Sequence, residues 1–75
     1  MKELLTIIAQ SLVDNPSAVE VKEVSGEHSI ILELKVAQED MGKVIGKQGR
    51  IAKSIRTVIK AAAIKENKRV VVEIV

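Results

Sequence analysis

The sequence predicts an α+β domain in which three helices cover one face of a three-stranded sheet. Some segments carry apolar residues at helical spacing, others alternate apolar and polar residues as strands do, and Pro and Gly separate several of them. The predicted order is helix, strand, strand, helix, helix, strand. Seventy-five residues without cysteine make a single domain, 1–75, which must be stabilised by packed aliphatic side chains.

The first half of the chain contains three predicted elements. Apolar residues at helical spacing predict a helix over 2–14, which ends at Asn15-Pro16 because the residue before proline is disfavoured in a helix. Valines mixed with charged residues predict a strand over 19–24. Strict alternation predicts a second strand over 30–36, joined to the first by a hairpin through 25–28.

Two helices and a strand are expected in the second half. A short helix over 39–45 starts at Glu39-Asp40, since acidic side chains favour a helix N-terminus, and capping and dipole effects explain this pair. A longer helix over 49–64 has one broad apolar face and one basic face. Asn67-Lys68 ends it, and 70–75 is the last strand, with alternate apolar residues on one side.

Positive charge is concentrated in one third of the chain. Residues 41–65 contain seven basic residues and no acidic one, whereas the other fifty residues hold five basic and ten acidic side chains. Such polarity suggests a polyanionic partner bound on one face, although solvated helix sides would explain the charge equally well. The seven residues are Lys43, Lys47, Arg50, Lys53, Arg56, Lys60 and Lys65.

Two glycines lie in the middle of this stretch, in the segment Val44-Ile45-Gly46-Lys47-Gln48-Gly49-Arg50. A four-residue turn between two helices requires at least one glycine in a conformation that is costly for other residues. Backbone N–H groups at the start of the following helix can then face a phosphate, with basic side chains beside them. The chain has no Phe, Tyr or Trp, so it offers no aromatic platform for stacking bases.

This segment resembles the GXXG core of K-homology (KH) RNA-binding domains. In that family the loop clamps the backbone of about four single-stranded nucleotides, and the bases lie between the helices and a strand edge. The element order is similar to the type II, prokaryotic arrangement with a mixed sheet, and the whole chain resembles small bacterial proteins made of one KH domain. The resemblance implies cytoplasmic single-stranded RNA binding and an RNA-chaperone or post-transcriptional role. It also implies pairing with itself or with a second KH protein, and a link to cell-wall growth and cell shape.

Site residues follow from the resemblance by position. The strand over 30–36 would form the opposite wall of the groove, and Ala52 departs from the family because many KH domains have a larger aliphatic residue there. Lys60 and Lys65 are expected to lie farther from the site. The clamp would be Gly46, Lys47, Gln48 and Gly49, with Arg50 beneath it, Val44 and Ile45 in the groove floor or core, and Lys43, Lys53 and Arg56 extending the positive field.

A second candidate surface lies at the edge of the apolar face of the long helix. It consists of small or apolar residues at roughly helical spacing, which either widen the core face or form a helix-to-helix dimer interface. The resemblance supports the dimer. The residues are Ser54, Val58 and Ala61, with Ile64 nearby.

Catalysis is not expected of this chain. His28 is read as a turn residue with no nucleophile or carboxylate placed to work with it, and the Ser and Thr residues match no nucleophile or phosphate-binding motif. We expect no enzyme activity, cofactor, metal, small-molecule substrate or membrane span.

Two alternatives to the KH reading remain at this point. A DNA-binding helix-hairpin-helix module also places a glycine turn between helices, but usually has an apolar residue where this chain has Lys47-Gln48. The other alternative is an adaptor that mainly binds a protein partner and binds RNA weakly.

Overall fold

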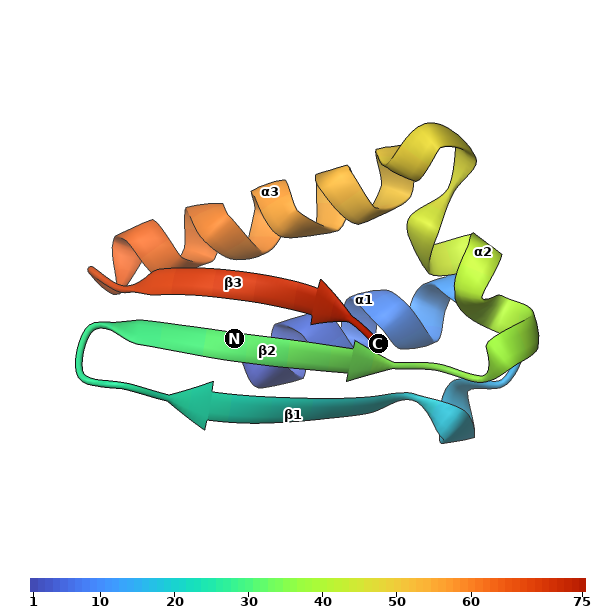
Figure 1. Ribbon diagram of the computed structural model, residues 1–75, viewed down its shortest axis with the longest axis horizontal. Helices are drawn as coiled ribbons and strands as arrows, with labels where there is room; N and C mark the ends of the chain where they lie inside the picture. The colour runs from blue at the N-terminus through green and yellow to red at the C-terminus, as the bar shows by residue number, and fades with distance from the viewer.

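In the computed structural model, which describes residues 1–75, three α-helices pack on one face of a three-stranded sheet (Figure 1). The predicted fold class and element order are confirmed. Short 3-10 turns at Pro16–Ala18, Gln38–Asp40 and Lys47–Gly49 join several of the elements. The elements are α1 (Lys2–Leu12), β1 (Glu20–Ser25), β2 (Ser29–Lys35), α2 (Met41–Ile45), α3 (Arg50–Lys65) and β3 (Arg69–Ile74).

The sheet has the order β1-β2-β3 and mixes both kinds of pairing. β1 and β2 form an antiparallel hairpin, whereas β2 and β3 are parallel, with Leu32 opposite Val72. Parallel neighbours need a crossover connection, which α2 and α3 supply. β2 is therefore the central strand and β3 an edge, so the expectation that residues 30–36 form a wall of the groove was wrong.

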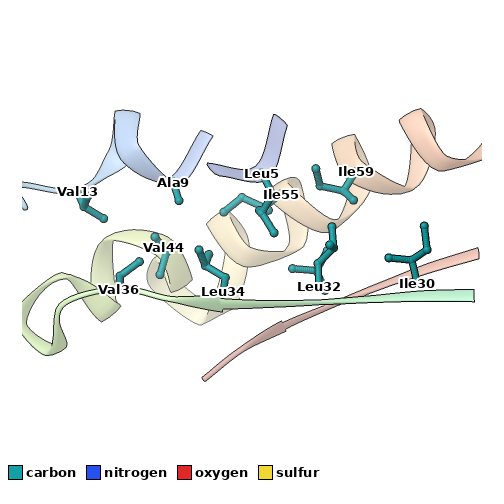
Figure 2. Close-up of a cluster of buried hydrophobic side chains, with 11 residues drawn as sticks. Leu5, Ala9, Val13, Ile30, Leu32, Leu34, Val36, Val44, Ile55 and Ile59 are labelled. Atoms are coloured by element: carbon teal, nitrogen blue, oxygen red, sulfur yellow. The ribbon is translucent and has the colours of Figure 1, made fainter. Parts of the chain in front are cut away.

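The core lies between β2 and the helices. Leu32 and Leu34 are completely buried, and Figure 2 shows them pointing from β2 toward side chains of α1 and α3. From the helices, Leu5 and Ile59 are also completely buried. Each such side chain stabilises the fold by about 1.5–3 kcal/mol relative to exposure. This single aliphatic cluster holds the long helix, and with it the basic stretch, against the sheet.

The end of α3 confirms the predicted break at Asn67-Lys68. Asn67 has φ 59°, a left-handed conformation that asparagine tolerates better than most residues. The Asn67 N–H donates to Ile64 O and the Lys68 N–H donates to Ala63 O, both at 3.0 Å. This is a Schellman ending, and it turns the chain back toward β3. No helix in the structure is long and apolar enough to cross a membrane.

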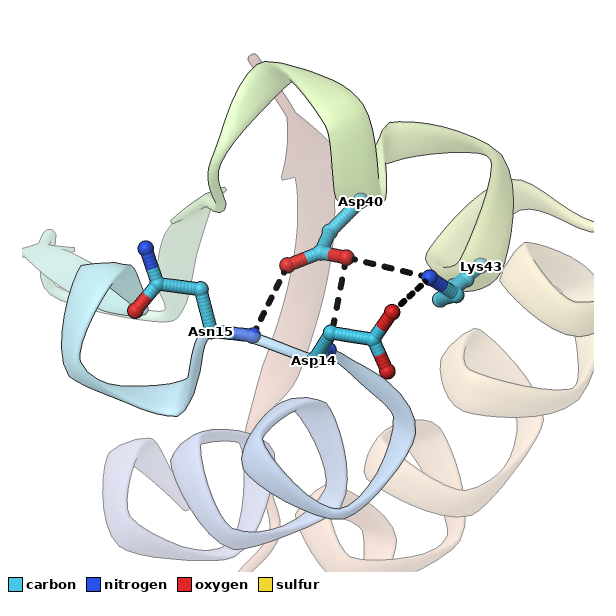
Figure 3. A network of polar contacts seen from close by, with 4 residues as sticks. All are labelled: Asp14, Asn15, Asp40 and Lys43. Atoms are coloured by element: carbon cyan, nitrogen blue, oxygen red, sulfur yellow. Dashed lines mark hydrogen bonds and ion pairs between the residues drawn. The ribbon is translucent and has the colours of Figure 1, made fainter.

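A buried carboxylate joins the end of α1 to the start of α2 (Figure 3). Asp40 is completely buried and accepts hydrogen bonds from the backbone N–H groups of Asn15 (3.1 Å) and Asp14 (3.3 Å). The Lys43 ammonium lies 3.3 Å from the same carboxylate and also pairs with the Asp14 side chain. Asp40 occupies the N-cap position of α2 as expected, but its side chain makes no capping hydrogen bond to α2, so this part of the interpretation was wrong.

The ionisation of Asp40 depends on this set of contacts. Burial alone would raise the pKa of Asp40, but the N–H groups of Asn15 and Asp14 and the Lys43 ammonium together outweigh burial and lower it. Hydrogen bonds to Asp14 and then to Asp40 raise the pKa of Lys43 in return. Both groups are therefore held in their charged forms.

We expect Asp40→Asn to lower the thermal midpoint of unfolding by several degrees. The carboxylate of Asp40 accepts hydrogen bonds from all its partners, whereas the amide nitrogen of asparagine is a donor and would face other donors. Since the folded pKa of Asp40 is lowered, its stabilisation is present above the unfolded value of about 3.9 and is lost as the pH falls through the folded pKa. The wild type should thus lose stability in this acid range more steeply than the variant. Circular dichroism melts between neutral and acid pH measure both effects.

Glu39→Gln is the matched control, because the neighbouring carboxylate is exposed and makes no ion pair. Equal melting of Asp40→Asn and Glu39→Gln at neutral pH would show that the buried carboxylate does not hold α1 to α2.

Candidate nucleic-acid interface

The turn between α2 and α3, which we call the glycine turn, consists of Gly46, Lys47, Gln48 and Gly49. Three of its four residues have positive φ: Gly46 at 75°, Gln48 at 56° and Gly49 at 74°. Glycine adopts this conformation without penalty, whereas for Gln48 it costs roughly 1–2 kcal/mol. A non-glycine residue in this conformation persists only where the surrounding structure holds it.

The two glycines are required for different reasons. A Cβ on Gly46 would lie only 2.6 Å from Cγ1 of Ile51, and its ψ of 175° combined with positive φ is a glycine conformation. A Cβ on Gly49 would meet nothing within 4 Å. Gly46 is thus demanded by both packing and backbone conformation, and Gly49 by conformation alone.

The side chains of the glycine turn are free of partners within the chain. Lys47, Gln48 and Arg50 are exposed, and their side chains make no ion pair or hydrogen bond. The turn is closed by its own backbone, with the Gly49 N–H donating to Gly46 O at 3.2 Å. It stands at the N-terminus of the 16-residue helix α3, where the helix dipole favours an anion. The structure thus brings together the residues predicted as the clamp and its basic border.

The residues just before the turn separate into three environments. Val44 is completely buried in the core, whereas Ile45 is 37% exposed beside the turn. Lys43, predicted to extend the positive field, is bound to Asp14 and Asp40, so two carboxylates oppose its charge. Lys53 is exposed on α3 and makes no ion pair.

A basic hollow lies between α3 and the edge strand β3, and we call it the α3–β3 groove. Its volume is about 450 Å³. Arg56 reaches across it, with Nε donating to Val72 O at 3.3 Å. Lys60, expected farther from the glycine turn, and Arg69, which was not singled out in the sequence, both line this groove. The lining residues are Arg56, Lys60, Arg69, Val70, Val71 and Val72.

A second hollow, between α1 and α3, has no charged lining residue, and we call it the α1–α3 groove. Its volume is about 440 Å³. Of the predicted dimer residues, Ser54 and Val58 line it, whereas Ala61 and Ile64 are exposed outside it. Val58, also expected in the core face, is 47% exposed. The lining residues are Leu4, Ile8, Leu12, Ile51, Ser54, Ile55 and Val58.

A mixed sheet covered by three helices, with a Gly-x-x-Gly turn joining two of them, defines a KH domain with the type II element order. The chain belongs to the family described as KhpA/KhpB, KH domain, whose model matches residues 2–74. Because this architecture is built on a sheet, the helix-hairpin-helix reading is not supported.

Relatives of high identity cover the whole chain. It is 80% identical to RNA-binding protein KhpA of Clostridium acetobutylicum and 79% identical to RNA-binding protein KhpA of Clostridium perfringens, in each case over 100% of both chains. It is 47% identical to RNA-binding protein KhpA of Aquifex aeolicus, over 99% of this chain and 94% of the relative. The comparison with solved structures gave no significant match.

The two glycines should differ in their sensitivity to alanine. Gly46→Ala should lower the free energy of unfolding by about 2–4 kcal/mol, since it combines a disallowed conformation with a clash against Ile51. Gly49→Ala, its matched control, should cost only about 1 kcal/mol, because conformation alone opposes it. Urea unfolding followed by circular dichroism measures both values, and equal losses would contradict the packing role of Ile51.

Proposed function

We propose that this chain binds single-stranded RNA, with the RNA backbone on the glycine turn and the bases along the α3–β3 groove. One observation carries the proposal: Lys47, Gln48 and Arg50 stand unpaired around a turn of positive-φ residues at the N-terminus of α3. An anionic polymer backbone supplies the acceptors that this arrangement lacks. Relatives of this chain carry the name RNA-binding protein, which supports the same conclusion.

The path of the RNA follows α3. Arg56 and Lys60 lie on this helix, about 10 and 15 Å beyond Gly49 and Arg50 by helical rise. Across the groove, Arg69 and the valines of β3 provide one more charge and an apolar floor. This length suits a footprint of about four nucleotides. The positive residues that continue the path are therefore Arg56, Lys60 and Arg69, while Lys43 is engaged with carboxylates.

Binding of this kind is mainly electrostatic. Without aromatic side chains the groove forgoes about 1–3 kcal/mol for each base that would otherwise stack. Weak, sequence-tolerant contacts fit an RNA chaperone or a post-transcriptional regulator. The link to cell-wall growth and cell shape that the resemblance implies stays a prediction.

Reversing charge at the glycine turn should weaken RNA binding. Lys47→Asp/Gln48→Asp should raise the Kd for a short fluorescent single-stranded RNA roughly 10-fold or more and flatten its salt dependence, which is about −0.7 per phosphate contacted in a log-log plot. Fluorescence anisotropy over a salt series measures both. Lys22→Asp/Ser25→Asp on β1 changes the net charge equally and serves as the control.

Unchanged affinity in the glycine-turn variant would favour the adaptor reading over the RNA clamp. If unlabelled duplex DNA displaced the fluorescent RNA as effectively as unlabelled single-stranded RNA does, binding of single-stranded bases along the α3–β3 groove would be contradicted.

We further propose that a second copy of this chain covers the α1–α3 groove. The groove is lined by six apolar residues and one serine, and it leaves Leu4 and Leu12 each 36% exposed. With no charged lining residue, it fits a partner surface that is equally apolar, and an identical copy offers one about a twofold axis. Arg56 and Lys60 lie along the other groove of α3, so this dimer leaves the RNA path open. A KhpB-like KH protein is the alternative occupant, suggested by the family description.

Val58→Asp should convert the dimer to a folded monomer, because it places a charge in the apolar lining of the groove. Sedimentation velocity measures the state, and circular dichroism checks the fold. Thr57→Asp adds the same charge one residue away, where the side chain is exposed outside the groove, and should leave the dimer intact.

A folded Val58→Asp variant that sediments like the wild type would exclude the α1–α3 groove as the interface. If the wild type is a monomer that binds a KhpB-like protein, and Val58→Asp abolishes this binding, the α1–α3 groove is the interface of the heteromer.

A further inference from the structure

Ile51 belongs both to the glycine turn and to the α1–α3 groove. Its Cβ, Cγ1 and Cδ1 would all lie 2.6–2.9 Å from a Cβ on Gly46, so only a hydrogen fits between the turn and this side chain. The same side chain lines the α1–α3 groove beside Ser54 and Ile55. A single partly buried isoleucine thus supports the turn from below and forms a wall of the groove.

We propose that Ile51 couples the two surfaces: a second copy filling the α1–α3 groove fixes the Ile51 side chain and so holds Gly46 and the RNA clamp in their binding conformation. The coupling rests on the dimer and the RNA binding proposed in the preceding subsection. It adds that self-association strengthens RNA binding through an identified contact.

The physical basis is the freedom that Ile51 has in a single copy. In a helix, branching at Cβ leaves isoleucine one preferred χ1 rotamer, so the mobile part is Cδ1, and one side of the residue faces the open groove. The turn above it contains Gln48 in a costly conformation, which persists only where the surroundings hold it. A second copy in the groove restricts the Ile51 side chain, so the glycine turn is already ordered in the dimer. RNA binding to the dimer then carries a smaller entropic cost than binding to a single copy.

The substituted side chain itself does not touch the glycine turn. Val58 lies seven residues from Ile51, about 10 Å along α3, and it lines the groove opposite in character to the basic α3–β3 groove proposed for RNA, so Val58→Asp affects RNA binding through the second copy. Thermodynamic linkage also requires the reverse effect, so RNA must strengthen self-association by the same factor.

The test is a double-mutant cycle on RNA affinity, with wild type, Val58→Asp, Ile51→Val and the double variant. The probe is a labelled single-stranded RNA of about four nucleotides, too short to bridge two clamps. We expect Val58→Asp to raise the Kd about 5-fold or more, and its effect to fall below about 2-fold when Ile51 is already Val. Thr57→Asp, with the same added charge, should bind like the wild type. Sedimentation of wild type with and without the RNA gives the reverse effect.

Each outcome decides the proposal. If the wild type dimerises and binds RNA, but Val58→Asp binds RNA with the same affinity, the coupling alone is overturned. If Val58→Asp raises the Kd for RNA by the same factor in the Ile51→Val background, Ile51 does not carry the coupling. If Ile51→Val no longer dimerises, the coupling is judged from the sedimentation of the wild type with and without RNA. A sedimentation coefficient that does not change when RNA is added would then overturn the coupling. A wild type that is monomeric, or that binds no RNA, would overturn the coupling together with that part of the proposed function.

Discussion

The parallel pairing of β2 with β3 is the constraint on which the rest of the molecule depends. Two parallel neighbours cannot be joined by a tight hairpin, so the chain must cross back over the sheet between residues 36 and 68. That crossover consists of α2, the glycine turn and α3. The same pairing places β3 at the sheet edge beside α3 (Figure 1). The basic groove lies between these two elements. The glycine turn and the α3–β3 groove are therefore two consequences of one strand pairing.

Local patterns in the sequence were sufficient to predict most elements and the β1–β2 hairpin, but not which strand lies beside α3. Alternation in β2 and the Asn67-Lys68 break identified the strand and the end of α3 within a residue or two. Which strand lies beside α3 depends on contacts between residues about forty positions apart, for which periodicity carries no signal. For this reason β2 was assigned to the groove wall, and the positions of Lys60 and Arg69 on the α3–β3 groove were not predicted.

Asp40 shows the same limit for the polar residues. Beside Glu39 at a helix start, it has a sufficient local explanation as a capping residue. Its actual donors, the N–H groups of Asp14 and Asn15, lie 26 and 25 residues earlier, and no spacing rule connects them. Lys43 is drawn into the same network, so a count of basic residues overstates the charge available to RNA. By contrast, the glycine turn was predictable, because its conformation is set by four consecutive residues.

The helix α3 explains how so small a domain presents two different grooves. Four residues at helical spacing, Ala52, Ile55, Ile59 and Ala63, are buried, and Ile55 and Ile59 belong to the core cluster with residues of the sheet. One flank of the helix is apolar and includes Val58, and the other carries Arg56 and Lys60. Because one rigid helix carries both flanks and begins at the glycine turn, their relative positions are fixed without a second domain. Ala52, which departs from the larger aliphatic residue of many KH domains, is 4% exposed, so this small side chain is buried and does not line either groove.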